Sequence, residues 1–213
     1  MSLFKKCEAK SLLSDDEKAR IEAAVCAAEA TTSGEIVPLI VDDAYTYPEA
    51  EIVAAGGFAL ALGVLLSWAF GGESLWIFLA IFLLSYLPLR LLIRALPPLK
   101  RTLIPPSVMA AEVEERALVA FVEHGIYRTR DATGILILIS LFERRVYILA
   151  DHGINAVVPP QSWDEIVAII RDGLKRNETA DALCTAIGRC GELLAADFPR
   201  RDDDRDELPN LIS

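Results

Sequence analysis

Four aspartates are the residues of this sequence that are best suited to chemistry. Each one flanks an apolar run that is long enough to be a β-strand, and together they are Asp42, Asp43, Asp131 and Asp151. Carboxylate oxygens are preferred ligands of Ca²⁺ and Mg²⁺, and a bound cation can activate water for hydrolysis. We therefore consider these residues a candidate Ca²⁺ or Mg²⁺ site. The alternative is that each aspartate simply caps a turn.

The direction of the strands decides whether the four aspartates can meet. Asp131 and Asp151 share one edge of a sheet if the runs 134–140 and 146–150 form a hairpin. The first aspartate pair joins them only if the strand before it is antiparallel to 134–140. A right-handed crossover would make those strands parallel and would place that pair at the opposite edge, beside Arg144 and Arg145. The sequence leaves both arrangements open.

No complete catalytic motif accompanies the aspartates in the sequence. The patterns GxSxG, HExxH and GxxxxGK[ST] do not occur. His124 precedes Gly125 at an expected helix end, where a cation is ordinary, and His152 follows Asp151. These observations favour a non-catalytic protein over a hydrolase.

Composition narrows the classes of protein further. The chain has 213 residues, of which 53% are hydrophobic, and a formal net charge of -10, with a mean hydropathy of +0.36. Such an apolar content excludes disorder over most of the chain. The 31 acidic residues outnumber the 21 Lys and Arg, and no basic stripe occurs, so we expect no nucleic-acid partner.

The hydrophobic excess is concentrated in one segment, 50–96. Residues 52–72 and 74–89 contain no Asp, Glu, Lys, Arg or His and are separated only by Glu73. About 20 apolar residues are needed for a helix to cross the bilayer, so we expect a transmembrane hairpin with spans at about 52–71 and 74–93. The alternative is a buried soluble hairpin, but the flanking segments are too short to cover two apolar helices.

Positively charged residues follow the second span and are absent from the turn of the hairpin. They are Arg90, Arg94, Lys100 and Arg101. Under the positive-inside rule, we expect the turn to lie outside and both soluble parts to lie in the cytoplasm. We expect these four cations to face the membrane. Arg144 and Arg145 could also contact anionic headgroups, or could lie in a solvated turn.

The segments on either side of the hairpin predict one α/β domain. Segment 12–45 holds a helix that opens with a capping box of Ser14 and Glu17, followed by a strand in which Pro38 removes one ladder donor. Segment 107–198 holds a helix, two strands and two helices, with a second capping box of Ser162 and Glu165. Because 12–45 cannot bury a core alone, we expect a mixed β-sheet between helices, interrupted by the inserted hairpin and followed by a charged tail, 199–213.

This arrangement resembles the TPM domain family, which includes thylakoid proteins of photosystem II repair and many bacterial membrane proteins. The resemblance rests on the order and spacing of short motifs: LSDDE at 13–17, TSGEIV at 32–37, RTRDATGILILIS at 128–140, ERRV at 143–146, DHGI at 151–154 and WDEI at 163–166. The ELP motif at 207–209 is similar to the subgroup with a membrane hairpin. The family's fold is a mixed sheet between helices. The roles suggested for its members range from phosphatase activity and cation binding to assembly.

The sequence therefore indicates two candidate functions. The first is a membrane-anchored, non-catalytic interaction module in the assembly, quality control or regulation of membrane proteins, with the lipid bilayer and another membrane protein as partners. The second is a phosphatase-like hydrolase that uses a divalent metal held by the strand-end aspartates.

Overall fold

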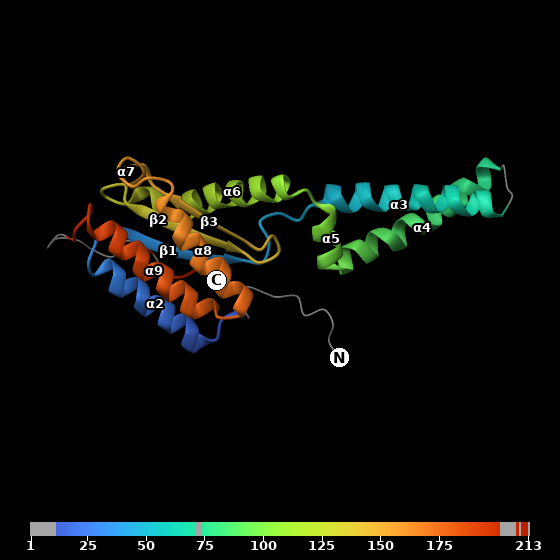
Figure 1. Ribbon diagram of the computed structural model, residues 1–213. Coiled ribbons are helices and arrows are strands. Elements are labelled where there is room, and N and C mark those ends of the chain that lie inside the picture. The colour runs from blue at the N-terminus through green and yellow to red at the C-terminus, as the bar shows by residue number, and fades with distance from the viewer. Residues whose placement is uncertain (1–11, 71–73, 201–207, 209, 213) are drawn as a thin grey trace. The chain divides into compact units, whose positions relative to one another are not determined.

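The computed structural model describes residues 12–70, 74–200, 208 and 210–212 (Figure 1). The expected membrane turn at Glu73 and most of the charged tail lie outside this range. The chain divides into two compact units. A helical unit includes Tyr45–Met109, and an α/β unit combines the described residues up to Ala44 with those from Ala110 onward.

The α/β unit begins with helix α2 (Asp15–Glu29) and strand β1 (Glu35–Val41). After the helical unit, the chain forms helix α6 and then two further strands that are connected by a tight turn. Helices complete the unit. These elements are α6 (Pro106–Glu123), η1 (Ile126–Arg128), β2 (Gly134–Ser140), β3 (Arg145–Ala150), α7 (His152–Asn155), α8 (Ser162–Arg176) and α9 (Thr179–Ala195).

The three strands form a mixed sheet in the order β1-β2-β3. β1 runs parallel to β2, with Glu35 opposite Gly134 and Val41 opposite Ser140. β3 runs antiparallel to β2, because only a tight turn separates them. The mixed sheet between helices predicted from the sequence is therefore confirmed, and the strands are joined across the inserted helical unit.

Helices cover both faces of this sheet. α2, α8 and α9 pack on one face through a core that includes Ile21, Ile170 and Leu183, and α6 packs on the other face through Val113 and Ala117. Figure 1 shows these two layers on either side of the strands. All seven residues of β2 are buried, which explains why this central strand is apolar along its whole length.

Of the two capping boxes predicted from the sequence, one is present in the structure and the other is not. The capping box at α2 is confirmed: the Glu17 N–H donates to Ser14 Oγ at 3.3 Å, and the Ser14 N–H donates to Glu17 Oε2 at 2.8 Å. The box predicted at Ser162 is wrong, because α8 begins one residue earlier and has Gln161 as its N-cap, without a side-chain capping bond. There the Ser162 N–H donates to the Pro159 carbonyl, so a turn replaces the cap.

The outer edge of β1 is largely protected. Its outward N–H groups belong to alternate residues: that of Ile36 donates to Glu29 Oε1 at 2.8 Å, Pro38 has none, and that of Ile40 donates to the Ile212 carbonyl at 3.1 Å. The Ile212 N–H in turn donates to the Pro38 carbonyl at 3.0 Å. Pro38 therefore does mark an edge strand, and the C-terminal segment covers that edge.

The helical unit contains α3 (Pro48–Ala69), α4 (Leu75–Ala95) and the short α5 (Pro97–Leu103). Buried small residues of α3 pack against α4, and a Cβ added at Gly63 would lie 3.0 Å from the Phe78 ring. Phe78, Phe82 and Tyr86 stack in sequence along α4, with ring centroids 6.3 Å apart. This pairing of small residues with larger ones lets the two helices approach closely.

Both α3 and α4 are long and apolar enough to cross a membrane. Only 17% of the most apolar stretch of α3 and 6% of that of α4 is buried. The helical unit therefore exposes large apolar side chains over most of the hairpin, and among them are Leu60, Val64, Leu83, Leu84 and Leu87.

Candidate functional site

The parallel pairing of β1 and β2 separates the four aspartates. Asp42 and Asp43 follow the end of β1, which lies beside the end of β2, whereas Asp131 precedes β2 and Asp151 follows β3 at the other end of the sheet. Of the two arrangements that the sequence left open, the structure has the parallel one, in which the four aspartates do not share one end of the sheet. Among the residues that the structure describes, no three His, Cys, Asp or Glu side chains gather into a group that could hold a metal.

Glu143 organises the end of the sheet that is followed by Asp42 and Asp43. This residue lies in the turn between β2 and β3 and is only 1% exposed. Its two carboxylate oxygens accept hydrogen bonds from the Ala44 N–H at 3.2 and 3.3 Å, and one of them also accepts from the Ser140 hydroxyl. In addition, the Phe142 N–H donates to the Asp42 carbonyl at 2.9 Å. The β2–β3 turn thus holds the chain in place where it leaves β1 for the helical unit.

The arginines of the same turn lie nearer the surface. Arg144 is exposed and has a φ of 52°, the left-handed conformation that lets the two strands reverse direction. Arg145 is half-buried and pairs across the sheet with Ser140. The structure thus places both arginines at the same end of the sheet as Asp42 and Asp43, as the crossover alternative required.

At the opposite end, Asp151 acts as a helix cap. Its Oδ1 accepts from the His152 N–H at 2.6 Å and lies 2.9 Å from His152 Nδ1, while Oδ2 is buried without a hydrogen-bond partner. The Gly153 backbone packs against the carbonyls of Asp131 and Ala132, which a Cβ would approach to 2.8 and 2.7 Å. Asp131 and Asp151 therefore belong to one compact corner, but together they offer too few carboxylates for the predicted metal site.

Lys100 has a role that the sequence did not indicate. Its Nζ lies 2.5 Å from Glu51 Oε1 and donates to the Thr46 carbonyl at 2.5 Å. The two side chains are only 13% and 9% exposed. The ammonium of Lys100 thus joins α5 to the start of α3 and is not available to headgroups. Of the other cations expected at the membrane, Arg94 is exposed, and Arg90 and Arg101 are half-buried.

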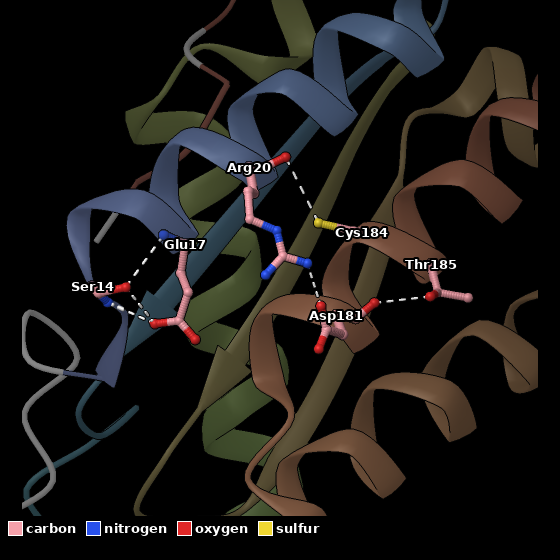
Figure 2. Close-up of polar contacts among 6 residues, drawn as sticks. All are labelled: Ser14, Glu17, Arg20, Asp181, Cys184 and Thr185. Carbon is pink, nitrogen blue, oxygen red and sulfur yellow. Dashed lines mark hydrogen bonds and ion pairs between the residues drawn. The ribbon is translucent and has the colours of Figure 1, made fainter.

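A polar seam joins α2 to α9 on the helical face of the α/β unit (Figure 2). The Arg20 guanidinium reaches across and pairs with Asp181. Beside this pair, the Cys184 thiol donates to the Arg20 carbonyl at 3.7 Å, and the Thr185 hydroxyl donates to the Asp181 carbonyl at 2.8 Å. Because Arg20 and Asp181 are more than half exposed, we regard this seam as a surface link between helices.

The shifted pKa values of the α/β unit fit structural roles. Hydrogen bonds with the backbone and side chain of Ser14 hold the pKa of Glu17 below its ordinary value. Burial raises the pKa of the Cys190 thiol to about 12. Burial, followed by the nearby Glu114 carboxylate, raises the pKa of Tyr147. None of these groups is gathered with the strand-end aspartates into a reactive centre.

Sequence reasoning missed that three glutamates of the described residues are buried: Glu35, Glu51 and Glu143. A glutamate in a tight turn is usually solvated, and nothing in the ERRV motif shows that Glu143 points inward. For Glu51 a signal did exist: it lies four residues before Ala55, and so shares the buried face of α3 with Ala55, Ala59 and Gly63.

The comparisons with known proteins concern the fold and the family resemblance. A family model of the TPM domain matches residues 101–193, and the resemblance seen in the sequence motifs is thereby confirmed. Among solved structures, the chain is similar to the BA42 protein of the psychrophilic bacterium Bizionia argentinensis, determined by NMR. The two are 24% identical, the match covers 100% of this chain and 99% of that one, and the TM-score is 0.58. This likeness shows a shared fold. No curated protein matches the chain.

Proposed function

We propose that this chain is a membrane-anchored interaction module of the TPM family, held at the cytoplasmic face of the bacterial inner membrane. It acts in the assembly, quality control or regulation of other membrane proteins. The observation that carries the proposal is the α3–α4 hairpin, whose outward apolar side chains are exposed and which is inserted in the chain between β1 and α6 of the α/β unit. Exposed apolar helices of this length support a location in a bilayer, which would cover them.

The interior of the hairpin supports a membrane setting as well. In a bilayer the hydrophobic effect does not drive helices together, so close packing of small residues has to do so. Ala55, Ala59 and Gly63 are the buried apolar residues of α3, whereas Leu60 and Leu65 are exposed. A soluble helix of this length would place its largest apolar side chains inside.

Reporter fusions test the orientation. A reporter that is active only in the periplasm is fused after Ser213 in one version and inserted at Gly72 in another. The positive-inside rule predicts activity at Gly72 and none after Ser213. Activity after Ser213 would overturn the cytoplasmic placement. A cytoplasm-active reporter at the same two positions controls for expression.

Crosslinking in intact membranes tests the interaction role. A photoreactive amino acid is introduced at exposed positions of the α/β unit in the full-length chain, and the captured proteins are identified and compared with those from a variant that lacks the hairpin, residues 50–96. We expect integral membrane proteins that are recovered only when the hairpin is present. Recovery of background alone would contradict the proposal.

Direct measurement of cation binding tests the hydrolase alternative. Because the carboxylates divide between two ends of the sheet, we expect titration calorimetry of the full chain with Mg²⁺ or Ca²⁺ to show no stoichiometric binding. Binding that is lost in Asp131→Asn and Asp151→Asn, but kept in Asp42→Asn, would instead support a cation site at the Asp151 end.

A further inference from the structure

An exposed apolar patch lies on the side of α6 that faces away from the sheet. Leu118 is 51% exposed, Val119 41% and Val122 62%. The opposite side of the helix, with Val113 and Ala117, is buried against β1 and β2. Residues three and four apart are neighbours on a helix surface, so these three side chains form one continuous surface, which we call the α6 patch.

Acidic residues border the α6 patch. Glu114 and Glu115 are both exposed and lie one turn before Leu118. From Ala110 to the end of α6 the helix has four glutamates and a single basic residue, Arg116, which pairs with Glu123 at 3.0 Å. The patch therefore combines an apolar centre with a negative border.

The negative border limits which kinds of surface could bind the α6 patch. The cytoplasmic leaflet is anionic and would repel glutamates, so the patch is poorly suited to lie on lipid. A segment with an apolar stripe flanked by Lys and Arg complements it in both respects. The positive-inside rule places Lys and Arg next to the spans of membrane proteins on their cytoplasmic side.

We propose that the α6 patch is the docking surface for a basic amphipathic helix, namely the Lys- and Arg-rich juxtamembrane segment of a partner membrane protein. This inference rests on the proposed function and specifies the partner that function requires. Leu118, Val119 and Val122 receive the apolar stripe of the partner helix, and Glu114 and Glu115 pair with its cations.

A defined peptide probe tests the proposal. The full-length chain in neutral-lipid nanodiscs is titrated with an 18-residue peptide that has Leu at helical spacing and Lys elsewhere, and with a scrambled peptide of the same composition. We expect the amphipathic peptide to bind at least about tenfold more tightly than the scrambled one, because only it presents a stripe. Equal affinity of the two peptides would mean that only their net charge matters for binding, and it would overturn the proposal.

Matched variants locate the binding. The double variant Leu118→Ser with Val122→Ser should weaken binding by at least about tenfold, whereas Val157→Ser, at a residue that is also 50% exposed but lies outside α6, should not. Glu115→Gln should weaken binding more than Glu22→Gln, at another exposed glutamate that lies outside α6, and the difference should shrink in 0.5 M salt. Unchanged binding by the α6 variant would overturn the proposal.

Crosslinking from the patch separates this inference from the proposed function. A photoreactive residue at position 118 or 122 should capture the basic juxtamembrane segment of a membrane protein, and mass spectrometry identifies the captured peptide. Capture of lipid, or of a second copy of this chain, at these positions would overturn the inference. If membrane proteins were captured from position 157 and not from 118 or 122, the proposed function would stand and this inference would fail.

Discussion

The buried carboxylate of Glu143 accepts a hydrogen bond from the backbone N–H of Ala44, 99 residues earlier in the chain. Ala44 is the last residue of the α/β unit before the chain enters the helical unit. The turn that joins β2 to β3 thus holds the point of exit from β1. A turn residue that sequence analysis treats as solvated is therefore part of the framework of the sheet.

Replacing Glu143 should lower the stability of the α/β unit. In Glu143→Ala, the Ala44 N–H and the Ser140 hydroxyl lose their buried acceptor, and we expect a loss of about 1–3 kcal/mol in the free energy of unfolding. Glu143→Gln keeps one acceptor oxygen and should cost less. Chemical denaturation of the full chain in detergent measures both, with Glu22→Ala as the exposed control. Equal stability of Glu143→Ala and the control would show that this contact is dispensable.

The capping box of α2 should make stability depend on pH in a defined direction. Because hydrogen bonds with Ser14 lower the pKa of Glu17 in the folded chain, the folded state favours the charged carboxylate. The stabilisation is then present above the unfolded-state pKa of about 4.5 and is lost as the pH falls through the lower folded-state value. Glu17→Gln removes this charge and should be less stable than the parent at pH 7.

Denaturation of both proteins from pH 7 to pH 3 tests this dependence, and the two unfolding curves should converge at the acid end. Ser14→Ala should cost about 1 kcal/mol at pH 7, the usual value of an N-cap. A gap between the parent and Glu17→Gln that stays constant with pH would contradict the assignment of the effect to the carboxylate.

The C-terminal segment should protect the edge of β1. Ile212→Pro removes the N–H that donates to the Pro38 carbonyl, and it should destabilise docking of the segment by about 1–2 kcal/mol. Hydrogen exchange at the Ile40 amide, which donates to the Ile212 carbonyl, should then become faster. Ile212→Val keeps the N–H and serves as control. If exchange at Ile40 is the same in all three proteins, the segment does not cover the edge in solution.

Two glycines of α3 should respond differently to enlargement. A Cβ at Gly63 would lie 3.0 Å from the Phe78 ring, whereas one at Gly57 has no atom within 4 Å. Gly63→Leu should therefore push α3 and α4 apart and cost about 1–3 kcal/mol. Gly57→Leu should be neutral or slightly stabilising, because it replaces a poor helix former.

Thermal unfolding of the two glycine variants in one detergent, followed by circular dichroism, makes the comparison. Position 57 is the matched control, because both residues lie on the same helix. A lower unfolding midpoint for Gly57→Leu than for Gly63→Leu would contradict the assignment of Gly63 to the side of α3 that packs against α4.

The local elements could be predicted because the signals for them are local. The Ser14–Glu17 box marks the start of α2, the apolar run 134–140 marks a strand covered on both faces, and the long apolar segments mark α3 and α4. At Ser162 the same local logic failed, because the turn at Pro159 had already satisfied the first N–H groups of the helix. Local patterns predict that an element exists better than they predict where it begins.

The candidate site could not be predicted in the same way, because it depends on strand direction. Asp42 and Asp131 have the same spacing from their strands whether β1 and β2 are parallel or antiparallel, and only the parallel pairing separates them. The partners of Glu143 and Lys100 are likewise distant in sequence. By itself, the sequence determined the longer helices, the three strands and the TPM resemblance, because periodicity and composition act locally. Only the tertiary structure decided which carboxylates meet and which charges are buried, because those contacts follow from how the strands pair.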